Sequence, residues 1–150
     1  MHYQRKAHKL LLDFWTLNRL RKLIIPLVDQ LDQTARFQSD RFASEYRPVI
    51  RELGLRCSEH EALLQQLNKN LLNKTRTDNI DAKAEAVLSI EALWSAVNEP
   101  LLPFVAETVP FVIECLEEPE IESATRQLVA TMESTSLCLP RRLCADVQSS

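Results

Sequence analysis

The feature that most restricts the fold of this chain is its single glycine, Gly54, among 150 residues. Sheets joined by tight hairpins need glycine where the turn backbone adopts a positive φ. Helix-favouring Leu, Ala, Glu, Gln, Lys and Arg are plentiful instead, and 45% of the residues are hydrophobic. The composition therefore predicts an all-α domain, and the length is enough for one modest core.

Apolar residues recur at helical spacing along most of the chain and predict seven amphipathic helices. Four are expected over 4–17, 20–33, 40–53 and 58–76. Three more are expected to begin after a cap at Asp78 or Asn79, after a cap at Thr108, and at Pro119. The residues expected to face the core are Ala7, Leu10, Phe14 and Leu17, then Leu20, Ile24, Leu27 or Val28 and Leu31, then Phe42, Tyr46, Val49, Ile50 and Leu53, then Leu63, Leu64, Leu67, Leu71 and Leu72, then Val87, Ile90, Leu93, Trp94 and Val97, then Val109, Val112, Ile113 and Leu116, and finally Ile121, Ala124, Leu128 and Met132.

Several helix ends carry local signals. Gly54 fits a left-handed residue that closes the third helix. Ser58 and Glu61 match a capping box for the fourth helix. Pro26 is expected to kink the second helix or to mark its first turn, because proline lacks the backbone N–H and clashes one turn back. Trp15 lies beside an apolar stripe and is expected, like Trp94, to belong to the core.

The stretch from Trp94 to Met132 shows two apolar helical faces in succession, punctuated by prolines. Short helices joined by tight loops place neighbours antiparallel, and stacked pairs of helices of about 15 residues are typical of HEAT or armadillo repeats. We therefore predict an α-solenoid of such helical pairs over residues 1–134, with a C-terminal capping helix. Residues 135–150 have no sustained apolar period and are predicted to be a disordered tail. A compact helical bundle without repeats is the structural alternative.

Charge is unevenly distributed along the chain. Up to Arg76 there are 14 Lys and Arg against 8 Asp and Glu, whereas from Thr77 onward there are 4 against 13. Basic and acidic halves of one solenoid can meet different partners, or they can be solvated helix faces. The cations that could contact phosphate are Arg19, Arg21, Lys22, Lys69, Lys74 and Arg76. The last two also suit the negative end of a helix.

No residue is predicted to be catalytic, to bind a cofactor or to hold a metal. The histidines are scattered and lie beside no nucleophile pattern. Glu118, Glu120 and Glu122 are expected to complement the positive end of a helix rather than to bind calcium. The four cysteines lack the short spacings of a zinc site and are expected to be reduced thiols of a nuclear or cytosolic protein: Cys57, Cys115, Cys138 and Cys144. Neither a membrane nor a small-molecule substrate is expected as a partner.

Two blocks of sequence carry a family resemblance. LLQQLNKNLLNKTR (Leu63 to Arg76) is a leucine-rich helix that closes on Lys-Thr-Arg, and LLPFVAETVPFVIECLEEPEIE (Leu101 to Glu122) places leucine-proline, glutamate and proline-phenylalanine before an acidic linker. In order and spacing these blocks resemble the C-terminal region of the HEAT repeat-containing protein 1 family, and the resemblance extends over residues 60–134. LIIPLVDQL (Leu23 to Leu31) is compatible with the preceding repeats.

Members of that family are very long solenoids, so the chain is expected to be a fragment or a short relative that holds only the last few repeats. The tail from Leu137 does not match the family. In a fragment, we expect the first helix to expose part of the stripe formed by Leu10, Leu11, Phe14 and Trp15, and such an open end favours self-association.

The resemblance implies a non-catalytic scaffold of the small-subunit processome in the nucleus and nucleolus, which supports pre-rRNA transcription and processing of small-subunit (18S) rRNA. The implied partners are processome proteins and a ribonucleoprotein that contains pre-rRNA and snoRNA. A general HEAT-repeat adaptor of the transport or phosphatase type is the alternative in the same class. A HEAT-like DNA glycosylase is the alternative in another class, but a base-binding cleft needs aromatic side chains, and only 6% of the residues are aromatic.

Overall fold

The computed structural model describes the backbone of residues 2–32 and 40–148, and the side chains of residues 14–32 and 45–136. The regular structure in these ranges is entirely helical. The α-helices are α1 (His2–Asp29), α2 (Asp40–Cys57), α3 (Glu61–Lys74), α4 (Ile80–Val97), α5 (Val105–Leu116) and α6 (Glu122–Gln148). Two 3-10 segments, η1 (Gln30–Asp32) and η3 (Glu99–Phe104), follow α1 and precede α5.

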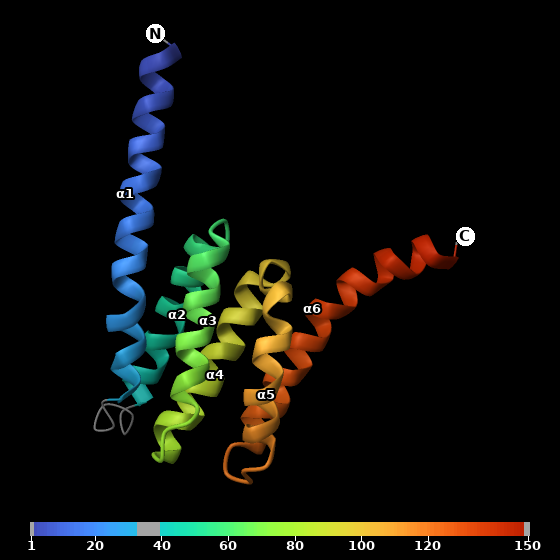
Figure 1. The fold of residues 1–150 in the computed structure, drawn as a ribbon. Helices are drawn as coiled ribbons and strands as arrows, with labels where there is room; N and C mark the ends of the chain where they lie inside the picture. The colour runs from blue at the N-terminus through green and yellow to red at the C-terminus, as the bar shows by residue number, and fades with distance from the viewer. Residues whose placement is uncertain (1, 33–39, 149–150) are drawn as a thin grey trace.

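Successive helices alternate in direction and stack in two layers (Figure 1). One layer contains α1, α3 and α5, because α3 packs against both of the others. The second layer contains α2, α4 and α6, with α4 packed between the other two. Each helix of the first layer also packs on the helix that follows it in the chain, which gives three antiparallel pairs. The chain is therefore an α-solenoid of HEAT-type helical pairs, as the sequence predicts.

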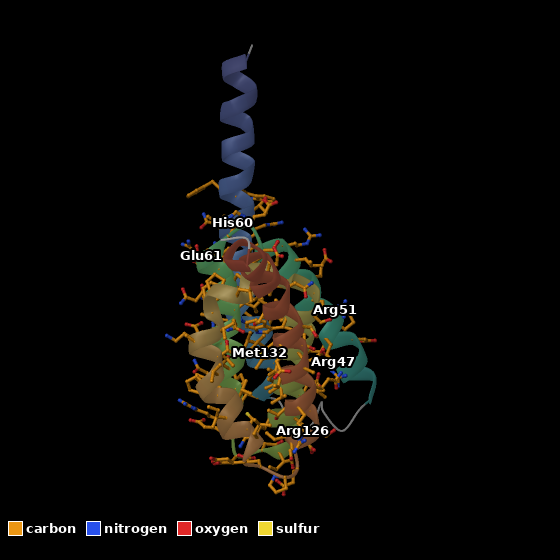
Figure 2. All side chains as sticks on the ribbon, turned by 90° about the vertical axis from the view of Figure 1, so that its right-hand side faces the viewer. Arg47, Arg51, His60, Glu61, Arg126 and Met132 are labelled. Atoms are coloured by element: carbon orange, nitrogen blue, oxygen red, sulfur yellow. The ribbon has the colours of Figure 1, made fainter. Side chains whose placement is uncertain are left out.

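The last helix of the row, α6, closes the solenoid with a polar outer face. Arg126 and Glu133 are exposed, whereas Leu128 and Met132 are buried against the neighbouring helices. Figure 2 views the molecule from this end, with Arg126 and Met132 labelled on α6. A solenoid needs such a polar face where no further repeat covers it. The predicted capping helix is confirmed.

The two helices predicted over 4–17 and 20–33 are one continuous helix, α1. Pro26 lies inside it and neither starts nor interrupts it. The helix persists because Leu20, Ile24, Val28 and Leu31 form one buried stripe that continues across the proline. The core residues predicted for 20–33 are thus confirmed, and the predicted break between the helices is wrong.

The first half of α1 projects beyond the other helices (Figures 1 and 2). Phe14 and Trp15 lie on this extension and are 64% and 54% exposed. The Arg19 guanidinium lies 4.1 Å from the centroid of the Trp15 ring. Phe14 and Trp15, which the sequence predicts to be core residues, are therefore not buried, because no other described helix covers this extension. Its exposure is what we expect at the open end of a solenoid, while Leu10 and Leu11 lie outside the described side chains.

The C-terminal helix is longer than the sequence predicts, because α6 continues as helix to Gln148. The sequence predicts a disordered tail over 135–150 from the loss of an apolar period. That loss removes a packing face but does not by itself end a helix, since Leu and Arg are good helix formers. The predicted helix end near residue 134 is wrong.

Gly54 does not close a helix. It lies inside α2, and its φ is not positive. A β-carbon at this position would collide with Leu93 Cδ1 and lie 3.1 Å from Val97 Cγ2, both on α4. Glycine is required here because α2 and α4 approach closely, and the predicted left-handed cap is wrong.

The helix start predicted at Asn79 is confirmed, and those predicted at Ser58 and Pro119 are wrong. The Asn79 side chain accepts a hydrogen bond from the Ala82 backbone N–H at 2.9 Å and caps α4. The capping box at Ser58 does not form, because the Ser58 hydroxyl donates to the Leu55 carbonyl at 2.6 Å and α3 begins only at Glu61. The last helix likewise starts at Glu122 rather than at Pro119.

The predicted apolar face of α5 is rotated from the observed one. The helix begins at Val105, so Thr108 lies one turn inside it and caps nothing. Val109, Ile113 and Leu116, which the sequence predicts to face the core, are 39%, 53% and 38% exposed. Thr108 takes their place in the core, together with Val112 and Cys115.

A buried polar network explains this rotation. Asn68 Nδ2 on α3 donates to Thr108 Oγ1 at 3.0 Å, and the Trp94 indole N–H on α4 donates to Asn68 Oδ1 at 3.2 Å. Thr108 in turn donates to the Phe104 carbonyl at 2.7 Å. The side chains of Asn68, Trp94 and Thr108 are fully buried, so the three polar groups satisfy one another. The network therefore fixes α3, α4 and α5 in one register.

We expect Gly54→Ala to lower the free energy of unfolding by about 1–3 kcal/mol, because the added methyl overpacks the contact between α2 and α4. Helix propensity alone predicts the opposite sign, a gain of about 1 kcal/mol. Chemical denaturation of the single variant, and of the same change in a Leu93→Ala background, measures the coupling free energy between positions 54 and 93. A Gly54→Ala chain more stable than the parent would contradict the close approach.

We expect Asn68→Ala to lower the free energy of unfolding by about 1–3 kcal/mol for each buried polar group left without a partner. The indole N–H of Trp94 is one such group, so its fluorescence should change with the loss of stability. Asn73→Ala, an exposed asparagine of the same helix, is the matched control and should change stability by less than about 0.5 kcal/mol. Equal effects at both positions would show that the network contributes nothing.

Candidate interaction surface

Ion pairs and hydrogen bonds join neighbouring helices of the same layer. Arg47 on α2 donates to both carboxylate oxygens of Glu85 on α4, at 2.8 and 2.9 Å. The Glu85 side chain is only 6% exposed, so the two parallel hydrogen bonds compensate for its desolvation. The hydrogen bond with Glu85 raises the pKa of Arg47, which stays charged. This pair fixes the first pair of helices on the second.

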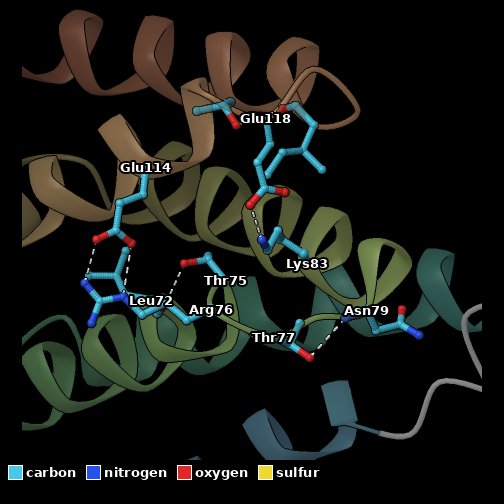
Figure 3. A network of polar contacts seen from close by, with 10 residues as sticks. Leu72, Thr75, Arg76, Thr77, Asn79, Lys83, Glu114 and Glu118 are labelled. Atoms are coloured by element: carbon cyan, nitrogen blue, oxygen red, sulfur yellow. Dashed lines mark hydrogen bonds and ion pairs between the residues drawn. The ribbon is translucent and has the colours of Figure 1, made fainter.

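Two of the cations that are candidates for phosphate contact form ion pairs with carboxylates of this chain instead. Lys74 Nζ lies 2.6 Å from Asp32 Oδ2 and 3.0 Å from Asp29 Oδ1. Burial opposes the charge on Lys74, but the hydrogen bonds with these two carboxylates outweigh it and raise the pKa of the ammonium. Arg76 donates to both oxygens of Glu114 on α5, at 2.9 and 3.1 Å (Figure 3).

The exposed cations of the first layer are different. Arg21 and Lys22 on α1 and Lys69 on α3 are exposed, and no ion pair holds them among the described residues. Arg19 is also exposed and stacks on Trp15. Unpaired cations are the ones that can exchange their counterions for phosphate groups. The candidates for external anion contact are thus reduced to Arg21, Lys22 and Lys69, with Arg19 beside them.

The opposite end of the solenoid is acidic. Glu117, Glu118 and Glu120 lie in the turn between α5 and α6, and Glu122 lies in the first turn of α6. Glu118 accepts a hydrogen bond from Lys83 on α4 (Figure 3), and Glu122 accepts two from Arg126. Glu122 complements the positive end of the helix, as predicted. Among the described residues, no group of His, Cys, Asp and Glu lies close enough to hold a metal ion.

A groove of about 610 Å³ opens between α1 and α2. Its walls are mainly apolar and include Leu23, Pro26, Leu27 and Val49. Tyr46 is the one aromatic residue that lines it, and this side chain is nearly buried, with its hydroxyl donating to the Leu27 carbonyl at 2.9 Å. Burial raises the pKa of Tyr46 above its usual range. A mainly apolar groove along two helices suits the side chains of a protein segment rather than a charged substrate.

The two cysteines with described side chains, Cys57 and Cys115, are free and buried. Burial raises the pKa of the Cys57 thiol to about 11 and also raises that of Cys115. A protonated, enclosed thiol is a poor nucleophile. Cys57 and Cys115 are core residues, in keeping with the reduced thiols that we expect. The side chains of Cys138 and Cys144 lie outside the described residues.

Two helical layers, three antiparallel pairs and a polar last helix place the chain in the class of HEAT-type α-solenoid proteins. Among curated proteins, it is 28% identical over 121 residues to HEAT repeat-containing protein 1 homolog of Dictyostelium discoideum. It is 26% identical over 127 residues to HEAT repeat-containing protein 1 of Homo sapiens, and 29% identical over 117 residues to U3 small nucleolar RNA-associated protein 10 of Mycosarcoma maydis. The resemblance predicted from the sequence is thereby confirmed.

These matches cover 77%, 81% and 70% of this chain, respectively. They cover only 5%, 6% and 5% of the relatives' own lengths, so the chain spans about one-twentieth of the curated relatives that it matches. The match fits the C-terminal region of such a protein. No family model and no solved structure matches the chain. Within the described residues, no helix is both long and apolar enough to span a membrane.

Sequence reasoning missed the residues that join the helices. Asn68, Thr108 and Glu85 are polar residues placed on buried helix faces, where an apolar stripe leads us to expect only hydrophobic side chains. A polar residue interrupting a stripe is the signal that could have found them, but it does not name the partner. The partners on other helices lie 26 to 40 residues away in sequence, so only the packed structure brings them together.

We expect the free energy of unfolding to fall as the pH rises from 9 to 11, in part because of Cys57. The unfolded thiol releases its proton near its ordinary pKa of 9.0, whereas the folded thiol keeps it up to about 11. Over this range the unfolded state therefore binds fewer protons, so stability decreases. Denaturation of the parent chain and of Cys57→Ala at pH 8, 9, 10 and 11 should show a shallower decrease in the variant. Parallel slopes would contradict the role of this thiol.

Proposed function

We propose that this chain is a non-catalytic docking module of nucleolar ribosome biogenesis, acting within the small-subunit processome. The observation that carries the proposal is its similarity, over 70–81% of its length, to HEAT repeat-containing protein 1 proteins and to a U3 small nucleolar RNA-associated protein. The partners would be processome proteins and the ribonucleoprotein that contains pre-rRNA and snoRNA. In this role the chain supports pre-rRNA transcription and 18S rRNA processing by holding partners together.

The mechanism rests on a rigid frame with charged surfaces. Arg47–Glu85, Lys74–Asp32 and Arg76–Glu114 each join two elements that are far apart in sequence, so the helical pairs hold a fixed spacing. Hydrogen bonds of this kind, supported by the buried Asn68 network, keep the outer faces in a constant arrangement. A fixed arrangement lowers the entropy cost of binding, because fewer groups must be ordered when a partner docks.

RNA phosphates are the proposed contact of the exposed cations Arg21, Lys22 and Lys69, which lie on α1 and α3 of one layer. The acidic turn between α5 and α6 would repel phosphate and leaves that end for protein partners. We place the docking module within residues 1–134 and assign no docking role to residues 135–150.

The test is affinity purification of the tagged chain from cells, with mass spectrometry and RNA sequencing of the recovered material. We expect processome proteins and pre-rRNA. Recovery of cytosolic partners alone would reject the nucleolar role and favour the general HEAT-repeat adaptor. The absence of any specific partner would reject the docking role of this part of the solenoid.

We expect the combined change Arg21→Glu, Lys22→Glu and Lys69→Glu to reduce pre-rRNA recovery, because it replaces three cations by anions. In vitro, each lost phosphate contact should reduce the slope of log affinity against log salt by about 1. The control combines Arg51→Glu, Arg56→Glu and Arg126→Glu, which reverses the same number of exposed charges elsewhere on the surface. Equal losses for both triple variants would show that net charge, and not this surface, determines RNA recovery.

A further inference from the structure

The groove between α1 and α2 lies on the side of the first helical pair that faces away from the second pair. Arg47 and Gly54 mark the side of α2 that contacts α4. Val49 and Arg56, which line the groove, each follow one of these residues by two positions, about 200° further round the helix. The groove therefore lies on the side of the first helical pair opposite the side that contacts the second pair.

Apolar side chains on both walls of this groove are exposed to solvent. Leu23 is 54% exposed and Val49 is 47% exposed, and they line the two opposite walls. Pro26 adds further apolar surface on α1. Contiguous apolar surface of this kind marks a site of protein contact.

The charges beside the groove are arranged with opposite signs at its two ends. The hydrogen bond from Tyr46 to the Leu27 carbonyl places these two residues at nearly the same level along the two helix axes. Leu23 and Val49 therefore lie level with each other near the middle of the groove. Toward the projecting end of α1, the described charges are Arg19, Lys22, Arg56 and Glu52, and the last two pair at 3.1 Å. Toward the η1 end they are Asp29 and Asp32, both bound by Lys74, and Glu45, which also has a partner. Among the described side chains, Arg19 and Lys22 give the first end an excess of positive charge, and the two aspartates outnumber Lys74 at the η1 end.

We propose that this groove binds the same groove of a second copy of the chain, in an antiparallel arrangement. A two-fold axis that crosses both helices at the level of Leu23 and Val49 places the basic end of each copy on the acidic end of the other. The same axis brings the two Leu23 side chains together and the two Val49 side chains together, so the apolar surfaces are covered. The interface is isologous, since one patch serves on both copies, and it forms a four-helix arrangement from two α1–α2 pairs. Purified chain alone tests this inference, so it holds or fails independently of the proposed function.

Sedimentation equilibrium of the purified full chain gives the dimer dissociation constant. We expect Leu23→Glu and Val49→Glu each to raise it by about 10- to 30-fold, as central interface residues do. The chain offers matched controls on the same helices: Ile25→Glu and Leu55→Glu replace residues that are 52% and 48% exposed but do not line the groove. These controls should dimerise as the parent does, and circular dichroism should show the same helix content in all four variants. A monomeric parent, or equal losses in the controls, overturns the proposal.

A cysteine introduced at the axis tests the orientation. Under mild oxidation, Leu23→Cys should form an intermolecular disulfide faster than Ile25→Cys and faster than the parent, which carries the same four native cysteines. In a parallel arrangement α1 faces α2 of the other copy. A disulfide that forms only when Leu23→Cys and Val49→Cys chains are mixed would therefore overturn the antiparallel interface. Raising the salt concentration should weaken the dimer, because the charged ends attract each other through solvent.

Discussion

The packing of α4 against α2 is the contact on which the rest of the structure depends. At Gly54 the two helices approach so closely that a β-carbon would require the Leu93 and Val97 side chains of α4 to shift. Ten residues of α4 are buried, because this helix also contacts α3 and α6. Dispersion and the hydrophobic effect act over all of these surfaces at once, so the stacking of one helical pair on the next is determined at this helix.

Polar contacts then select one register among the many that apolar stripes allow. Asn68, Trp94 and Thr108 satisfy one another only when α3, α4 and α5 are aligned as observed. A shift by one residue would leave buried donors and acceptors without partners, each at a cost of about 1–3 kcal/mol. Arg47 with Glu85 has the same role nearer to the surface. The network thus gives the solenoid a fixed shape, which a docking protein requires.

The same ion pairs decide which charges remain for partners. Lys74 and Arg76 look like candidates for phosphate in the sequence, but carboxylates from α1, η1 and α5 hold them. Arg21, Lys22 and Lys69 remain exposed on the first layer, while the exposed apolar residues concentrate at the first helical pair. The two proposals use different chemistry, cations for phosphate in one case and an apolar groove with charged ends in the other, and Lys22 belongs to both.

The sequence by itself determined the helical class, most of the buried residues and the family resemblance, because these depend on local spacing and composition. A single glycine excluded tight hairpins, and the stripes of α3 and α4 name core residues such as Leu67 and Trp94 correctly. Only the tertiary structure decided the continuity of α1, the role of Gly54 and the rotation of α5. Each of these depends on a neighbouring helix far away in sequence: α3 for the buried stripe of α1, α4 for Gly54, and Asn68 of α3 for Thr108. Trp15 shows the converse, since it lies beside an apolar stripe in the sequence but is 54% exposed, and no other described helix covers it.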